Sequence, residues 1–306
     1  MSLILGEDPC EKVQAPTHLS IFTASSSILI TIVASVGNAI VVLAVFLNPN
    51  RDMRTPFYYF IANLSIADLI VGLITGSMSA IYHILAALNV TEEHFRTVMI
   101  VAFFVSCTVS LLSLQALAME RYLAIMHPAI YRTMLSPVRA FLVSVLVWIL
   151  SILLSTIYFF VQYNTYRFIF GNTALAFTIV VLIFTNTKIL KYLRQQIQHW
   201  DTLHESTEEN LIMKQLMMWE KKMTKTLVIV MLLFVAFYLP SCVFIYIINL
   251  CTNCDCIFIH WIRDIQFLLI MANSAVNPFV YPWRLENFRR SFSSILKCRA
   301  CRSDPV

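Results

Sequence analysis

Seven blocks of apolar residues, separated by short polar segments, recur along the chain. Each block is long enough for a transmembrane helix, which needs roughly 20 mainly apolar residues. The blocks are continuous rather than amphipathic stripes, as expected of helices that cross a bilayer. They predict an all-α, seven-transmembrane helix bundle over residues 20–282, with spans at about 20–47, 56–84, 94–126, 138–160, 171–196, 220–248 and 260–282. Residues 1–19 form a polar N-terminus before the bundle.

The pattern changes after the last span, over residues 283–306. Leu285, Phe288, Phe292 and Ile295 recur at spacings of three and four, among Arg284, Arg289, Arg290 and Lys297. This spacing predicts a short amphipathic helix 8 in the cytoplasmic interface, followed by a short tail. The alternative is a frayed tail, because Pro282 is an awkward start for a helix.

Composition and charge agree with a membrane protein. The chain of 306 residues is 59% hydrophobic and 13% charged, whereas a soluble domain is about half apolar and a quarter charged. Of the 22 Lys and Arg residues, 18 belong to the predicted inner loops, helix ends and tail. The positive-inside rule then predicts a multi-pass plasma-membrane protein with its N-terminus extracellular and its C-terminus cytoplasmic. The net charge of +5 is spread over alternate helix ends, so nucleic acid is not an expected partner. The N-terminus has no cleavable signal pattern, and the first helix is expected to act as a signal anchor.

Polar residues within the apolar blocks should contact one another, because polar groups are costly in hydrocarbon. Asp68 is the only carboxylate deep in the predicted bundle, and no basic residue lies at its depth. Ser110, Asn273 and Asn277 could supply hydrogen-bond donors or oxygen ligands. The set suits either a small cation such as sodium or a protonated Asp68 in a hydrogen-bond cluster.

A second group of charges falls at the predicted cytoplasmic helix ends. Glu120, Arg121 and Tyr122 end the third span, and Glu220 begins the sixth. A bridge between Arg121 and Glu220 would hold the two helix ends together and could bias a two-state equilibrium. The alternative is a set of ordinary solvated charges, for which a single exposed bridge contributes little.

Prolines and glycines mark two further features. Pro240 and Pro278 each remove a helix hydrogen bond and are expected to kink the sixth and seventh helices. Gly72 and Gly76 form a small-xxx-small pair, which we expect to pack helices within one bundle.

Together these residues resemble the rhodopsin-like (class A) G-protein-coupled receptors over nearly the whole chain. The matching segments are Gly37-Asn38, Leu64-Ser65-Ile66-Ala67-Asp68, Glu120-Arg121-Tyr122, Trp148, Phe234 to Pro240, Asn277-Pro278-Phe279-Val280-Tyr281 and Phe288.

The resemblance implies a receptor that activates a heterotrimeric G protein and is not an enzyme. Arg121 would contact the G protein once the sixth helix moves outward, and Glu120 and Glu220 would restrain it at rest. Tyr281 would turn inward on activation. Asp68 and its neighbours would bind sodium as an allosteric modulator, with no other cofactor.

The departures from the family pattern concern the outer cysteines and the fifth and sixth helices. The third helix has no cysteine near Arg96, so the usual outer disulfide is absent. Extracellular cysteines favour disulfides, and the outer side offers Cys10, Cys251, Cys254 and Cys256. These four allow three full pairings, and loop proximity suggests one bond within 251–256 and one to Cys10. Helix 5 also lacks a proline, Phe184 replaces a usual tyrosine and Tyr238 a usual tryptophan. This set resembles the melanocortin branch and, more loosely, its adenosine, cannabinoid and lysolipid relatives.

Several ligand classes are disfavoured by the residues at matching positions. A retinal Schiff base needs a lysine in the seventh helix, where Met271 stands. Amine receptors use an aspartate in the third helix, where this chain has Phe103-Phe104. The acidic cluster that melanocortin receptors use is replaced by Met78 and Ile100.

The expected ligand pocket is mostly apolar, with a few small polar groups. Its residues are Phe103, Phe104, Cys107, Thr108, Tyr238, Ser241, Cys242, Ile245, Phe267 and Met271. Polar residues are expected near its mouth, namely Tyr82, His83, Arg96, Tyr246, His260, Arg263, Asp264 and Gln266. This favours an apolar or amphipathic, lipid-like small molecule. The alternatives are a melanocortin-like peptide ligand and a purely structural role for these aromatic residues.

The sequence also offers sites for covalent modification outside the membrane spans. Asn89-Val90-Thr91 is a glycosylation sequon in the first outer loop, and Cys298 and Cys301 follow the amphipathic helix and suit palmitoylation.

A transporter would need an ion path through the core, which offers a single deep carboxylate. An intramembrane hydrolase would need converging catalytic groups at membrane depth, whereas the histidines fall near helix ends and loops.

Overall fold

The computed structural model describes residues 10, 13–47, 53–90, 93–161, 163–202, 208–251 and 253–300. Within these residues, 7 helical segments are long and apolar enough to cross a membrane, which confirms the predicted bundle. They are α1 (Thr17–Leu47), α2 (Pro56–Ile70) continued by η1 (Val71–Gly76) and α3 (Ser77–Ala87), α4 (Glu93–Met126), α6 (Pro137–Thr156) continued by η2 (Ile157–Phe159), α7 (Tyr163–Thr202), α8 (Glu208–Leu250) and α9 (Cys256–Arg284). Two shorter helices are α5 (Pro128–Met134) and α10 (Glu286–Ala300).

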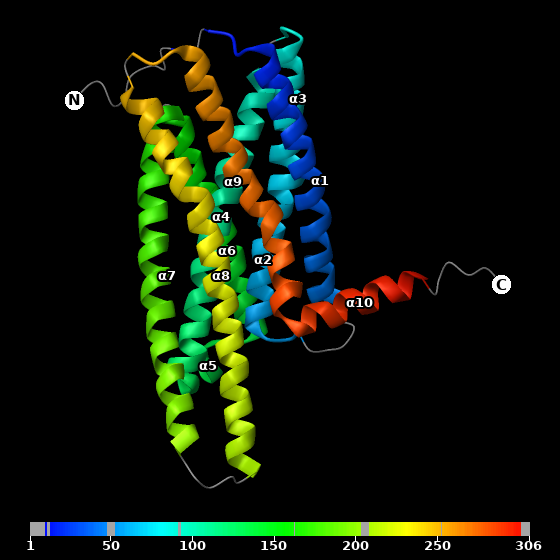
Figure 1. The fold of residues 1–306 in the computed structure, drawn as a ribbon, viewed down its shortest axis with the longest axis vertical. Helices are drawn as coiled ribbons and strands as arrows, with labels where there is room; N and C mark the ends of the chain where they lie inside the picture. Colours follow the sequence, from blue (N-terminus) through cyan, green and yellow to red (C-terminus); the bar gives the residue numbers. More distant parts are fainter. Residues whose placement is uncertain are drawn as a thin grey trace, which may run out of the picture.

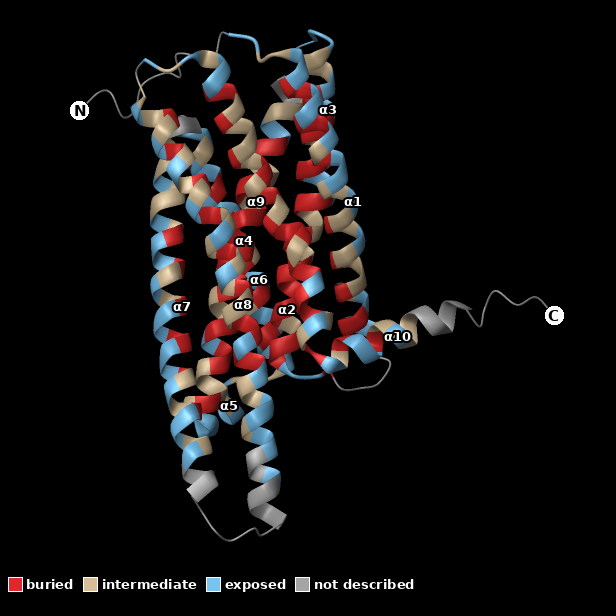
Figure 2. Ribbon diagram, in the orientation of Figure 1, coloured by how far each residue is buried: buried red, intermediate tan, exposed pale blue. Residues whose placement is uncertain are grey.

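The long helices run side by side and form one bundle (Figure 1). Helix α4 contacts α2, α6, α7 and α8, which makes it central to the packing. Buried residues face the interior and exposed ones face outward along the whole length of the bundle (Figure 2). The outward face of α6 carries large apolar side chains, including Val138, Phe141 and Leu153. Such a face suits contact with lipid.

Helix α2 passes through a π-helical turn, η1, that the apolar pattern does not predict. The turn carries Gly72 and Gly76 against α1. A Cβ atom at Gly72 would lie 2.6 Å from Ser35 Oγ and 3.0 Å from its backbone nitrogen, and one at Gly76 would meet Thr31 Oγ1. The two glycines therefore permit close packing of α1 on the second span, within one bundle as predicted.

The helices of the third inner loop are longer than their predicted membrane spans. Helix α7 runs to Thr202 and α8 begins at Glu208, so both helices extend beyond the spans predicted at 171–196 and 220–248. The start predicted for the fifth helix, residue 171, is wrong, because α7 begins at Tyr163. Polar residues at the start of α7 were assigned to a loop, although they continue the helix. Helix α9 also begins earlier than predicted, at Cys256, where the Asp255 side chain accepts a hydrogen bond from the Ile257 amide at 3.3 Å.

Helix α10 confirms the predicted amphipathic segment after the bundle. It leaves the bundle sideways (Figure 1), with Phe288 buried and Arg289 and Arg290 exposed. Pro282 lies inside α9 rather than at the start of the new helix. The pKa of Glu286 is lowered by the hydrogen bond that it accepts from Arg290 at 2.7 Å.

Candidate functional site

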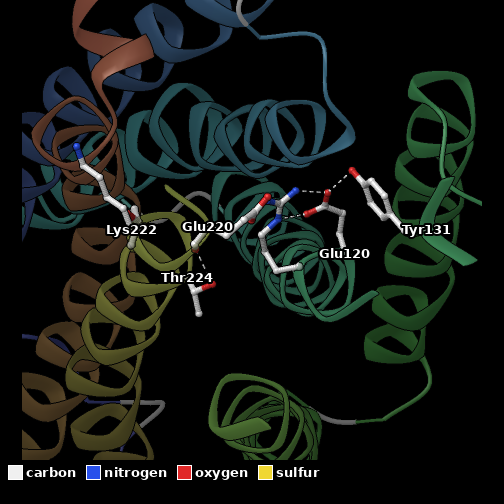
Figure 3. A network of polar contacts seen from close by, with 7 residues as sticks. Glu120, Tyr131, Glu220, Lys222 and Thr224 are labelled. Carbon is white, nitrogen blue, oxygen red and sulfur yellow. Dashed lines mark hydrogen bonds and ion pairs between the residues drawn. The ribbon is translucent and has the colours of Figure 1, made fainter. Parts of the chain in front are cut away.

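An ion network joins α4 to α8 at the end of the bundle that carries α5 and α10 (Figure 3). Arg121 is 3% exposed and donates to both carboxylate oxygens of Glu120, which is 2% exposed. Its Nη1 also donates to Glu220 Oε2 at 3.0 Å. The structure thus brings together the three charges that the sequence singled out. A buried guanidinium needs such partners, because an unpaired buried charge is very costly.

Two aromatic residues that the sequence analysis missed complete this network. The guanidinium of Arg121 lies over the ring of Phe57, 4.6 Å from its centroid. Tyr131, on α5, donates to Glu120 Oε1 at 2.9 Å. Burial, followed by the charge of Glu120, raises the pKa of the Tyr131 phenol well above its usual range, so it remains a donor at physiological pH. The apolar pattern predicts no helix over 128–134, so it does not place Tyr131 beside Glu120.

Tyr122 lies outside the ion network although it adjoins Arg121 in sequence. Its ring packs 5.7 Å from His127 and 6.2 Å from Phe184, centroid to centroid. It joins a small apolar cluster with Ile125, Ile189 and Leu193. The Tyr122 side chain therefore packs between α4 and α7.

Asp68 is fully buried at the centre of the bundle. Asn277 donates to Asp68 Oδ2 at 2.8 Å, and Ser110 donates to Oδ1 at 3.3 Å. The predicted polar cluster therefore links α2, α4 and α9. Asn38 extends the polar contacts from α1 by donating to the Ser274 carbonyl at 2.9 Å.

Within the described part of the chain, three buried oxygen atoms in this region have no hydrogen-bond partner. They are Asn273 Oδ1, Asn277 Oδ1 and the hydroxyl of Tyr281. Amide oxygens beside a carboxylate are suitable ligands for a hard cation. Tyr281 is held by its ring, which stacks on Phe288 at 5.7 Å.

A narrow inner cavity lies between α4, α7, α8 and α9; its non-atom space of about 410 Å³ includes space open to solvent. Most of the predicted pocket residues line it, namely Phe103, Phe104, Cys107, Tyr238, Ser241, Cys242 and Ile245. Three predicted residues do not. Thr108 donates to the Phe104 carbonyl, Met271 is fully buried, and Phe267 lines a second cavity nearer the outer end.

Arg167 and Phe170 also line the inner cavity, and the sequence analysis missed both. They were assigned to the outer loop because α7 was expected to begin at 171. The helical spacing of 167, 170, 171 and 174 was the available signal, since these positions share one face of an α-helix.

An outer cavity with about 1370 Å³ of space, part of it open to solvent, adjoins the inner one. Phe267 lines the outer cavity and Phe103 the inner one, and their rings lie 5.0 Å apart. Six predicted mouth residues line the outer cavity: Tyr82, His83, Arg96, His260, Arg263 and Asp264. Gln266 lines the inner cavity instead, and Tyr246 donates to Asn172 at 2.6 Å.

Two disulfides close the same end of the molecule. Cys10 is joined to Cys256, and Cys251 to Cys254. Each of the three full pairings that the sequence left open has one bond to Cys10 and one within 251–256, and the structure has this one. The first bond brings the N-terminal segment to α9, where the Val13 carbonyl lies 2.8 Å from His260 Nε2.

The modification sites fall at opposite ends of the bundle. Asn89 follows α3 with a positive φ of 58°, which asparagine tolerates, and lines the outer cavity. Cys298 lies in α10, but its side chain is outside the described part, as is all of Cys301.

Comparison with known proteins gives a match over most of the chain. The family model described as seven-transmembrane receptor (rhodopsin family) matches residues 37–281. The chain is 28% identical to the histamine H2 receptor of Canis lupus familiaris, over 97% of this chain and 83% of that protein. It is 28% identical to the human histamine H2 receptor, over 89% and 77%. It is 27% identical to a QRFP-like peptide receptor of Branchiostoma floridae, over 91% and 78%.

Proposed function

The chain belongs to the rhodopsin family of seven-transmembrane receptors, and from that premise we propose that the ion network around Arg121 holds its resting state. The chain is a G-protein-coupled receptor, a multi-pass protein of the plasma membrane, and not an enzyme. Glu120 and Glu220 keep Arg121 between α4 and α8. Separation of α8 from α4 would release Arg121 to contact a heterotrimeric G protein.

The seventh helix completes this proposed switch. Asn277 is bonded to Asp68, and Pro278 follows it inside α9. Proline leaves a carbonyl in the preceding turn without its helix partner, which makes this part of α9 easier to bend. Such a bend would turn Tyr281 away from Phe288 and toward the bundle interior.

The distribution of charge and cysteine supports an extracellular N-terminus and a cytoplasmic C-terminus. The disulfides join Cys10 and the segment between α8 and α9, and Asn89 directly follows α3. These helix ends lie at one end of the bundle, and the basic helix α10 lies at the other (Figure 1). Disulfides persist in oxidising compartments. In this orientation Asn89 is available for glycosylation, and Cys298 and Cys301 for palmitoylation beside the inner leaflet.

The inner cavity supports an apolar or amphipathic small molecule as the ligand. The observation that carries this proposal is its wall, which is built largely from aromatic and aliphatic side chains. Amine recognition normally needs a carboxylate in the pocket, and the described residues that line the inner cavity include none. The histamine H2 receptors are thus similar in fold without implying the same ligand.

A peptide ligand is the second candidate. The outer cavity is wide and polar enough to hold a peptide terminus. One relative is named as a peptide receptor. A peptide would occupy the outer cavity and extend only partly past Phe103 and Phe267.

A binding screen separates the two candidates. The full chain in lipid nanodiscs is heated with decanol, decanoate, histamine or a melanocortin peptide, and the midpoint of thermal unfolding is measured. We expect an amphiphile to raise the midpoint and Tyr238→Ala to abolish that rise, because Tyr238 lines the inner cavity. If only the peptide stabilises the receptor, and Tyr238→Ala does not change that effect, the ligand binds in the outer cavity.

We further propose that sodium binds beside Asp68. The buried carboxylate and the orphaned oxygens of Asn273 and Asn277 fit a hard cation, and Ser110 lies next to them. Bound sodium would supply a positive charge that offsets Asp68 in the resting state.

Replacing sodium by N-methylglucamine is expected to lower the thermal midpoint of the wild type. Saturation at ten times the dissociation constant contributes about 1.4 kcal/mol. Asp68→Asn should remove the dependence on sodium, while Asn63→Ala, on the same helix, should keep it. An equal response of wild type and Asp68→Asn would exclude this site.

A further inference from the structure

A pair of aromatic rings separates the inner cavity from the outer one. Phe103 lines the inner cavity and Phe267 the outer, and their ring centroids lie 5.0 Å apart. Phe103 is only 7% exposed. Among the described residues that line the outer cavity, none belongs to α7 or α8. A ligand dissolved in the outer water would therefore have to displace the ring pair before it reached the inner cavity.

The partly exposed wall of the inner cavity lies on α7 and α8. The described lining residues that come from α4 and α9 are all buried. Those with partial exposure are Phe170, Gly171 and Ala174 on α7, and Cys242 on α8. The open part of the cavity is therefore on the side of the bundle that these two helices form.

The line of contact between α7 and α8 at Gly171 and Cys242, here called the seam, is thin. The two helices run side by side (Figure 1), and Cys242 Sγ lies 3.7 Å from the Gly171 carbonyl oxygen. Gly171 has no side chain to cover the cavity. A Cβ atom at this position would approach Ile245 Cδ1 to 3.2 Å. Glycine at position 171 thus leaves the seam narrow but unfilled.

The outside of the seam faces hydrocarbon rather than water. The nearby outward residues are apolar and at least half exposed, namely Ile169 and Phe177 on α7, and Leu239 and Val243 on α8. Such a surface suits contact with lipid tails. An amphiphile partitions into the bilayer in proportion to the length of its apolar tail. The bilayer would therefore present such a molecule to the seam at a much higher concentration than the surrounding water.

A polar pair joins the two helices beside the seam. The Tyr246 hydroxyl donates to Asn172 Oδ1 at 2.6 Å, and the Tyr246 ring packs edge-on against Phe168 at 5.2 Å. Asn172 is held in place because its amide nitrogen donates to the Phe168 carbonyl at 2.8 Å. Tyr246 is 41% exposed and does not line the inner cavity. This bond can therefore open without rearrangement of the cavity itself.

We propose that the ligand enters the inner cavity sideways from the bilayer, through the seam at Gly171, and that the bond between Tyr246 and Asn172 restrains this opening. The inference rests on the proposed function of the inner cavity as the site of an amphipathic ligand. It narrows that ligand to a membrane-resident amphiphile and assigns its route of entry to α7 and α8.

A disulfide across the seam provides the test. A Cβ atom at position 171 would lie 4.0 Å from Cys242 Sγ, so a cysteine there comes within disulfide reach once the Cys242 side chain turns. The full-length Gly171→Cys receptor in nanodiscs is oxidised with copper phenanthroline either before or after decanol is added. Excess protein-free vesicles then extract unbound decanol, and the decanol that remains bound is measured by mass spectrometry. Gly171→Cys/Cys242→Ser, which cannot form the bond, is the matched control.

We expect the receptor oxidised after addition to retain decanol, and the receptor oxidised beforehand to take up none. The control should take up and lose decanol freely under both treatments. Equal exchange in the oxidised receptor and the control would overturn entry through the seam and leave the amphipathic pocket in place. Failure of decanol to bind even the wild type, seen as an unchanged thermal midpoint, would overturn both.

Tyr246→Phe tests the route in a chain whose cavity wall is unaltered. Loss of its hydrogen bond to Asn172 is expected to make extraction of decanol by vesicles about fivefold faster, as the net contribution of one hydrogen bond implies. The rise in thermal midpoint at saturating decanol should stay the same. Tyr192→Phe, near the other end of α7, should behave like the wild type. An unchanged extraction rate in Tyr246→Phe would contradict the restraint, and it decides the matter if Gly171→Cys does not fold.

Discussion

Glu220→Ala is expected to raise basal G-protein activation about fivefold. Glu220 is 21% exposed in its side chain, and its bond to Arg121 spans α4 and α8. For a partly solvated pair of this kind we take about 1 kcal/mol, which shifts a two-state equilibrium by about a factor of five. Arg121→Ala should abolish the signal, because the residue proposed to contact the G protein is removed.

The measurement is G-protein activation in cells without added ligand, at matched surface expression. Glu286→Ala is the matched control, since it removes an arginine–acid pair of α10, Arg290 and Glu286, whose side chains are 59% and 52% exposed. This variant should signal like the wild type. A Glu220→Ala receptor with wild-type basal activity, in an assay where the control also behaves as expected, would show that the bridge does not restrain α8.

Removal of the Cys10–Cys256 disulfide is expected to destabilise the receptor more than removal of Cys251–Cys254. The first bond spans 246 residues and the second only 3. The chain-entropy relation gives about 5 kcal/mol for the long loop and about 2 kcal/mol for the short one. Both are upper values here, since helices that persist in the unfolded state already restrict the chain.

Double serine variants of each pair would be compared by thermal unfolding of the purified full chain without reductant. The Cys10/Cys256 variant should unfold roughly 10 °C lower than the wild type, given about 2–4 °C per kcal/mol for a chain of this size. It should also release the N-terminal segment from His260. An equal or larger loss in the Cys251/Cys254 variant would mean that loop length does not determine the effect.

The seven spans were predictable because each is a long apolar run, and the bilayer imposes that requirement directly. The pairing of Arg121 with Glu220, and of Asp68 with Asn277, was also predictable. Charged and polar groups within a membrane bundle have few partners available, so their contacts follow from depth alone.

Other features depend on packing that a single sequence does not reveal. The π-helical turn η1 is accommodated by the fit of Gly72 and Gly76 on α1. Arg167 looked like an ordinary outer-loop cation, because its side chain turns inward only when α7 begins at Tyr163. Phe57 could not be assigned to Arg121, since a cation over an aromatic ring has no sequence spacing of its own.

The unequal arms of α8 on either side of Pro240 have a mechanical consequence. Ten residues separate Pro240 from Leu250 and twenty separate it from Glu220, so at helical rise the arms are roughly 15 Å and roughly 30 Å. If α8 tilts about the proline, a small sideways adjustment at the outer tip becomes about twice as large at Glu220. A displacement too slight to disturb the outer packing can therefore exceed the reach of the hydrogen bond to Arg121.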